Sequence, residues 1–255
     1  MVSGFFILKS LEKKETVYGI RAVLEAIDAN QPINKIFVQK GLKGDLFKEL
    51  ESAARKNGIS LSYVPVEKLN RLTRNNHQGA VAQISPVEFH NFEALVEKTL
   101  SKEEYPLFLL LDGVSDVRNF GAIIRTAECS GVHGIIIPKN GGAPITDDTV
   151  KTSAGAAFNV PIAKVDHLKD AVFYLQSSGI VVTGATEKAE DDIYGIDFKK
   201  PTAIIMGSED KGISPSTLSI IDHKAKLPLL GKIGSLNVSV ACGVFLYEVV
   251  RQRKA

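Results

Sequence analysis

Six short apolar runs in the second half of the chain constrain its fold more than any other feature. Segments with helical periodicity separate the runs, which read LFLLLDG, GIIIP, VPIAKV, GIVVTGAT, TAIIMG and HKAKLPL. Strands that are apolar on both faces and alternate with helices are typical of a parallel sheet covered on both sides. The sequence therefore predicts an α/β domain over residues 106–255, with its ligand beyond the carboxyl ends of the strands.

The first part of the chain predicts a separate, smaller α/β domain within residues 1–90. Its periodicity indicates helices over residues 19–29 and 45–57 and strands over residues 35–39, 61–64 and 80–84. Residues 91–105 are charged and helical in pattern, and Pro106 ends them. We predict that this segment is the linker between the two domains.

Composition limits the function classes without selecting one. The net charge of +2 allows a nucleic-acid partner but does not argue for one, and the apolar runs are far shorter than a membrane span needs. Cys129 and Cys242 have no C-x-x-C partner and lie in apolar helical patterns, so we expect buried, unreactive thiols and a cytoplasmic protein. The five histidines lack metal-ligand spacing, and we predict no metal.

Three loops that follow predicted strands carry the chemistry. The first contains Asn119 and Arg125, the second reads MGSEDKGIS from Met206, and the third reads LPLLGKIGSLNVS from Leu227. Each loop alone could be an ordinary glycine turn, with Asn119 or Ser235 capping the helix that follows. In the first loop, we expect Asn119 and Arg125 to reach the mouth of the sheet from one helix.

The loops do not match the patterns of nucleotide-binding proteins or of Ser-His-Asp hydrolases. The G-x-x-x-x-G spacing of the second loop has Ile213 where a phosphate-binding lysine would stand, and no strand precedes a G-x-G-x-x-G pattern. The loops contain no histidine and no Ser-His-Asp order that would indicate acyl transfer.

Taken together, the three loops resemble the signature motifs of the SpoU (SPOUT, TrmH-like) family of RNA 2′-O-ribose methyltransferases. They match N-x-G-x-x-x-R, G-x-E-x-x-G and S-L-N-V-S-V-A in order and spacing. The stretches YGIRAVLEAI and HQGAVA resemble the amino-terminal RNA-binding domain of the RlmB type, which methylates a guanosine of large-subunit rRNA. The chain departs from the family pattern at Val117, where proline is common, and at Asp210, where glycine is common. Because aspartate tolerates left-handed backbone, we expect the second loop to survive.

The resemblance implies a carboxyl-terminal trefoil knot that binds S-adenosylmethionine through Gly207, Leu227 and Leu236. It places five polar residues around the transfer centre: Asn119, Arg125, Glu209, Ser235 and Asn237. It also implies a homodimer formed by the knot and the last helix. The apolar side chains of that helix, Val240, Val244, Phe245 and Val249, fit either such an interface or the core of one chain.

The predicted function is methylation of a ribose 2′-hydroxyl in structured RNA, at a guanosine of large-subunit rRNA. The alternatives are a tRNA ribose methyltransferase, an antibiotic-resistance rRNA methyltransferase, and a non-catalytic RNA-binding or ribosome-assembly protein in which Asp210 spoils cofactor binding. A polar loop in the first domain is the expected RNA contact, through Arg71, Arg74, His77 and Gln78, although a solvated loop would look the same. Arg251, Arg253 and Lys254 either extend this basic surface or only solvate the last helix.

Overall fold

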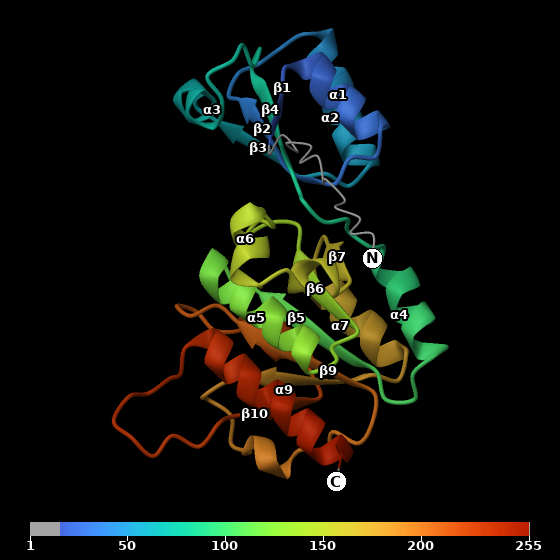
Figure 1. The fold of residues 1–255 in the computed structure, drawn as a ribbon, viewed down its shortest axis with the longest axis vertical. Helices are drawn as coiled ribbons and strands as arrows, with labels where there is room; N and C mark the ends of the chain where they lie inside the picture. Colours follow the sequence, from blue (N-terminus) through green and yellow to red (C-terminus); the bar gives the residue numbers. More distant parts are fainter. Residues whose placement is uncertain (1–15, 255) are drawn as a thin grey trace, which may run out of the picture. The chain divides into compact units, whose positions relative to one another are not determined.

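The first unit of the molecule is a four-stranded sheet with helices on both faces. The computed structural model describes residues 16–254, and the chain divides into two compact units between Pro86 and Val87. The strands of the first unit have the order β1-β4-β2-β3, with bounds Thr16–Tyr18 (β1), Ile33–Gln39 (β2), Leu61–Val64 (β3) and Ala80–Ile84 (β4). Helices α1 (Ile20–Asp28) and α2 (Asp45–Lys56) pack on one face, and α3 (Val66–Leu72) lies on the other (Figure 1).

The predicted elements of this unit are confirmed, and the structure adds two that the sequence did not indicate. The predicted helices and strands lie within two residues of their observed ends. Strand β1 has three residues and helix α3 has seven, so neither is long enough to produce a clear periodic signal.

The second unit contains a six-stranded sheet in which every pair of neighbouring strands is parallel. Its order is β10-β8-β9-β5-β6-β7. The strands are Leu107–Asp112 (β5), Gly134–Pro138 (β6), Ile162–Val165 (β7), Val181–Ala185 (β8), Thr202–Gly207 (β9) and His223–Ala225 (β10). Each of the six apolar runs contains one of these strands, which confirms the predicted parallel α/β sheet.

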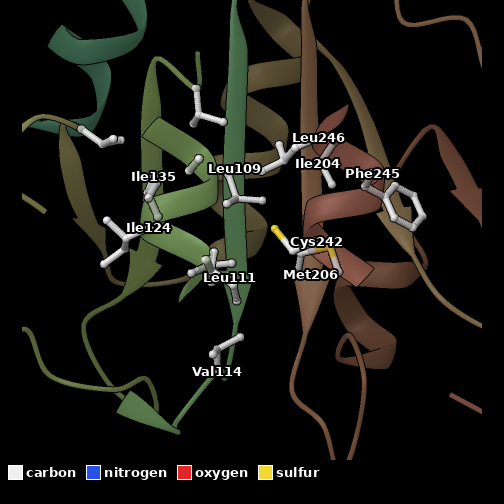
Figure 2. Packing of buried hydrophobic residues seen from close by; sticks show 14 of the residues in the cluster. Leu109, Leu111, Val114, Ile124, Ile135, Ile204, Met206, Cys242, Phe245 and Leu246 are labelled. Atoms are coloured by element: carbon white, nitrogen blue, oxygen red, sulfur yellow. The ribbon is translucent and has the colours of Figure 1, made fainter. Parts of the chain in front are cut away.

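Helices cover both faces of this sheet, as the apolar strands require. Helices α5 (Val117–Cys129) and α9 (Val238–Lys254) pack on one face against Leu109 and Leu111 of β5, where Figure 2 shows Cys242 and Leu246 reaching the sheet. Phe108 and Leu110 point to the opposite face, which α4 (Phe92–Leu100) and α7 (Leu168–Ser177) cover. Short helices complete the unit: α6 (Asp147–Thr152), η1 (Ala156–Phe158), η2 (Ile193–Gly195) and α8 (Pro215–Leu218).

The segment 91–105, predicted as a linker, is instead part of the second unit. Asn91 caps α4 by accepting a hydrogen bond from the Ala94 N–H at 2.8 Å. Phe92 and Val96 of this helix are buried in the core beneath β5 and β7. Upstream of the helix, the His90 N–H donates to the Ile162 carbonyl at 2.9 Å, so this stretch also lies along the edge of β7. The charged residues that suggested a linker form the outer face of a packed helix.

One expectation about a cysteine is wrong, and the four apolar residues of the last helix divide between the core and the surface. Cys242 is fully buried, and burial raises the pKa of its thiol to about 12, as expected of an unreactive cysteine, but Cys129 is exposed near the end of α5. Phe245 and Val249 belong to the core of the second unit, whereas Val240 and Val244 are exposed. No helix among residues 16–254 is long and apolar enough to cross a membrane.

Candidate active site

A cavity of about 470 Å³ lies at the carboxyl ends of the strands of the second unit, where such sheets bind ligands. The segments that follow β8, β9 and β10 form its walls together with the first turns of α9. Its lining contains six of the predicted site residues: Gly207, Glu209, Leu227, Ser235, Leu236 and Asn237.

Hydrogen bonds join the three predicted loops at the edge of this cavity. Oε1 of Glu209 accepts from Nδ2 of Asn119 at 2.8 Å and from Nδ2 of Asn237 at 2.8 Å. Asn237 Nδ2 also donates to Asn119 Oδ1 at 3.0 Å. The three side chains come from positions 119, 209 and 237, so the fold brings together residues that are far apart in the sequence.

Two helix starts hold this cluster in place. Asp116 caps α5 through its Oδ1, which accepts from the Arg118 and Asn119 N–H groups, and so Asn119 stands in the first helical turn. Asn237 directly precedes α9, and its Oδ1 accepts from the Ser239 N–H at 3.0 Å, in the manner of a helix cap. The Glu209 carboxylate therefore lies beside two helix amino termini, whose dipoles favour a negative charge.

The loop after β9 is tightly folded because of its glycines. A Cβ atom added at Gly207 would lie 2.0 Å from the carbonyl carbon of Gly212, so no larger residue fits without a backbone shift. Ser208 and Gly212 pair across this loop, and Gly212 has a φ of +66°. Asp210 is not among the described residues with positive φ, so its replacement of the common glycine does not strain the turn. Val117 similarly takes only the first helical position of α5, where proline is favoured but not required.

Arg125 does not join the cluster within its own chain. It lies six residues beyond Asn119 on α5, which places it about 120° away around the helix axis. Its side chain is exposed and has no hydrogen bond or ion pair with any residue from 16 to 254. Asn119 is thus part of the hydrogen-bonded cluster, whereas the placement of Arg125 at the mouth of the sheet stays a prediction.

Comparison with known proteins identifies the family. The sequence profile of the SpoU rRNA methylase family matches residues 106–247, and the profile for the substrate-binding domain of RNA 2′-O ribose methyltransferases matches residues 16–90. The chain belongs to the SpoU methylase family. It is 35% identical over 242 residues to YacO of Bacillus subtilis, which is assigned to the TrmH family of tRNA/rRNA methyltransferases, and this match covers 95% of the chain and 97% of YacO.

Solved structures of SpoU proteins share the fold. The SpoU methyltransferase AviRb from Streptomyces viridochromogenes, crystallised with its cofactor AdoMet, is 26% identical with a TM-score of 0.59, over 94% of this chain and 90% of AviRb. The TrmH/SpoU tRNA-modifying enzyme of A. aeolicus is 30% identical with a TM-score of 0.55, over 63% of this chain and 85% of that enzyme.

The cavity of this SpoU chain also includes a wall that the motifs did not indicate. Ala185 ends β8, Thr186, Glu187 and Lys188 follow it, and Lys226 follows β10. The run GIVVTGAT had predicted β8, so the rule that ligands lie at carboxyl strand ends was sufficient to nominate these residues. Among the residues from 16 to 254, the structure contains no group of three or more His, Cys, Asp or Glu that could hold a metal ion.

In the substrate-binding unit, the predicted RNA loop is an ordered turn. His77 Nδ1 accepts from the Gly79 N–H at 3.0 Å, which leaves its Nε2 to donate to Asn70 Oδ1 at 3.0 Å. Gln78 adopts a left-handed φ of +48°. These two residues therefore shape the loop, whereas Arg71 and Arg74 are exposed and unpaired with respect to the described chain.

The basic residues at the end of α9 have different surroundings. Arg253 donates to the carbonyls of Phe198, Tyr105 and Lys200 at 3.0, 2.6 and 2.9 Å, and Arg251 is paired with the buried carboxylate of Glu248. Both arginines thus have partners within the fold, and of these three basic residues only Lys254 is exposed and without a partner among the described residues.

Proposed function

We propose that this SpoU protein transfers a methyl group from S-adenosylmethionine to the 2′-hydroxyl of a ribose, at a guanosine of large-subunit rRNA in the cytoplasm. The observation that carries this proposal is the meeting of Asn119, Glu209 and Asn237 at the edge of one cavity. These residues come from the three signature motifs, and residues that act in one reaction centre must lie close together.

The cavity suits the proposed cofactor in size and in chemistry. Its volume of about 470 Å³ falls within the usual range for small-molecule sites. Met206, Leu227 and Phe245 supply apolar surface for a flat ring, while Glu187, Lys188 and Lys226 supply charged groups suited to an amino-acid moiety. Gly207 lets the backbone approach closely, because any side chain there would collide with Gly212. When bound, S-adenosylmethionine supplies a methyl group activated by its sulfonium charge.

The residues of the cluster have separate tasks in this proposal. Glu209 fixes the two asparagines, and Asn119 and Asn237 hold the loops that orient the ribose next to the cofactor. Ser235 lines the cavity and is free to bind the ribose. Arg125 binds the neighbouring phosphate and stabilises the charge that develops on the 2′-oxygen, while the hydroxyl proton passes to water, because a guanidinium is too weak a base to accept it.

A homodimer would bring Arg125 to this centre. Val240, Val244 and Tyr247 form an exposed stripe along α9, with exposed fractions of 53%, 37% and 50%, and Leu230 and Ile233 are exposed in the preceding loop. We propose that a second copy covers this surface, closes the cavity and supplies the arginine that each chain lacks at its own cluster. Family membership further supports a trefoil knot in the carboxyl-terminal part of the second unit.

The choice of RNA rests on the first unit. Its match to the substrate-binding domain supports a large, structured RNA, and the resemblance to the RlmB type supports rRNA over tRNA. The non-catalytic alternative requires Asp210 to disrupt the second loop. The backbone φ of Asp210 is not positive, which argues against such a disruption. Arg71 and Arg74 are the proposed phosphate contacts, on a turn shaped by His77 and Gln78.

Calorimetry followed by methyl-transfer assays tests the proposal. The purified protein should release or absorb heat on specific binding of S-adenosylmethionine and should methylate large-subunit rRNA, with the product mapped as a 2′-O-methyl nucleotide. Parallel reactions with tRNA test the alternative substrate. Absence of cofactor binding would indicate the non-catalytic function, and transfer to tRNA alone would overturn the choice of rRNA.

A further inference from the structure

One face of the sheet in the first unit is covered by much less protein than the other. Helices α1 and α2 bury one face, including Ile36, Val38 and Ala82. The opposite face carries the seven-residue helix α3 (Figure 1), whose Leu69 packs on Val64 and Val81. Tyr18, Phe37 and Leu72 pack against this small cluster but stay partly exposed, so part of the face is accessible.

The strand register shows which side chains share the accessible face. Val81 is paired with Tyr18 of β1 on one side and with Phe37 of β2 on the other, and Gln83 is paired in the same way with Thr16 and Lys35. Residues directly opposite each other in a sheet point to the same face. The face therefore presents two rows, Tyr18–Val81–Phe37 and Thr16–Gln83–Lys35, in which every residue except Val81 is partly exposed.

The charges around these rings are mostly positive. Lys68 of α3 places its Nζ 5.3 Å from the centroid of the Phe37 ring, and Lys35 stands on the same strand as Phe37. Arg71 lies at the end of α3 and is exposed, and Glu67 is the acidic residue of that helix. Two partly exposed aromatic rings, with the Lys68 ammonium over one of them and further cations nearby, complement a chain that combines flat bases with negative phosphates.

We infer that this face binds a single-stranded segment of the RNA substrate, with bases stacked on Tyr18 and Phe37 and phosphates near Lys35, Lys68 and Arg71. The inference rests on the proposed function, because it places part of the substrate of the same enzyme. A single strand is the occupant because a duplex keeps the faces of its bases stacked on one another, whereas unpaired bases can lie on aromatic side chains. The sheet thus adds a second RNA contact to the loop at residues 71–78.

Binding of a defined RNA by the full-length protein tests the inference. The probe is an unstructured single-stranded RNA of about 12 nucleotides, which is within the span of known stacking sites. The same RNA annealed to its complement is the second probe, and no cofactor is added. Tyr18→Leu and Phe37→Leu remove a ring and keep the site apolar, and each should weaken single-strand binding by about tenfold. Tyr18→Phe should bind normally because it retains the ring.

Tyr63→Leu is the matched control. Tyr63 belongs to the same sheet and is 47% exposed, but it lies on the face of α2, where its ring meets Phe47. Its loss should leave RNA binding unchanged. Thermal unfolding and cofactor binding of each variant show whether it remains folded. Cross-linking from 4-thiouridine in the single strand needs no variant, and the cross-links should map to β1 or β2.

Three results would each overturn the inference: wild-type affinity in folded Tyr18→Leu and Phe37→Leu variants, cross-links confined to residues 73–78, or equal loss of duplex binding. Because the assay uses no cofactor, a protein that binds the single strand but never transfers a methyl group would refute the proposed function and leave this RNA site standing.

Discussion

Asn237 uses its two amide atoms for different tasks. Its oxygen caps α9 by accepting from Ser239, and its nitrogen donates to Glu209 and Asn119. Asn237→Asp keeps a capping oxygen but replaces the donor with a charge that faces Glu209. We expect α9 to persist, with near wild-type helicity by circular dichroism, while affinity for S-adenosylmethionine falls by tenfold or more, on the order of one lost charged hydrogen bond with added repulsion.

Asn237→Ala is the comparison for that variant, since it removes the cap as well and should lower the thermal stability further. If Asn237→Asp bound the cofactor as tightly as wild type, the bridge to Glu209 would have no part in shaping the site.

Arg125 separates the catalytic interpretation from a purely structural one. Arg125 is exposed and has no partner in the described chain, so Arg125→Ala should change the free energy of unfolding by less than about 0.5 kcal/mol. If it stabilises the reacting oxygen, single-turnover methyl transfer at saturating RNA and cofactor should fall by about a hundredfold or more. Arg125→Lys should recover only part of the rate, because it lacks the planar fork that binds a phosphate.

Lys169→Ala is a suitable control, because Lys169 is also exposed but lies on α7, on the opposite face of the sheet from α5. A wild-type rate for Arg125→Ala under saturation would remove Arg125 from the proposed mechanism.

At the scale of the element, the carboxyl end of α9 is hydrogen-bonded to the segments that precede β5 and β9. Arg253 donates to main-chain carbonyls beside the starts of β5 and β9, and burial lowers the pKa of its guanidinium. Arg253→Ala would remove the donor of the Phe198 and Tyr105 carbonyls, while the Lys200 carbonyl would keep its hydrogen bond from the Thr202 hydroxyl. We expect it to lower the free energy of unfolding by about 2–4 kcal/mol, measured by urea denaturation.

The neighbouring Lys254→Ala should change stability by less than about 0.5 kcal/mol, because its side chain is solvated. A loss of RNA affinity by Arg253→Ala at unchanged stability would instead favour the basic-surface interpretation.

At the scale of the whole molecule, the two units predict a division of labour. Removal of residues 1–86 should leave cofactor binding intact, because the cut falls before the first residue of the second unit, and should greatly weaken methylation of rRNA. Removal of residues 1–105 should give an unstable protein, because it also deletes α4 and uncovers the core that Phe92 and Val96 fill.

Calorimetry with S-adenosylmethionine, methyl-transfer assays with rRNA and urea denaturation of both truncated proteins check these outcomes. Full methylation by the protein without residues 1–86 would contradict the separation of RNA binding from methyl transfer, and a stable protein without residues 1–105 would restore the linker assignment.

The sequence was sufficient for the parallel sheet, and it nominated most of the residues that line the cavity or join the hydrogen-bonded cluster. The central strands β5 and β9 are short apolar runs, because a strand buried on both faces has no polar side to interrupt it, whereas the edge strand β10 reads HKA and is only partly buried. The three motifs nominated Asn119, Glu209 and Asn237 because reactive loops collect at the carboxyl ends of such strands. The charged residues around α4 led to the wrong prediction of a linker over residues 91–105. A helix with one buried stripe keeps a polar outer face, and its sequence can resemble that of a linker.

The tertiary structure decided which of these residues meet. Sequence spacing cannot show that Glu209 lies between the starts of α5 and α9, because that contact depends on how the strands are ordered and the helices packed. Arg125 stands near Asn119 in the sequence but faces away from it, since six residues do not complete whole turns of a helix. The accessible face with Tyr18 and Phe37 likewise arises only when β1, β4 and β2 pair, because strand register, which is non-local, determines which side chains share a surface.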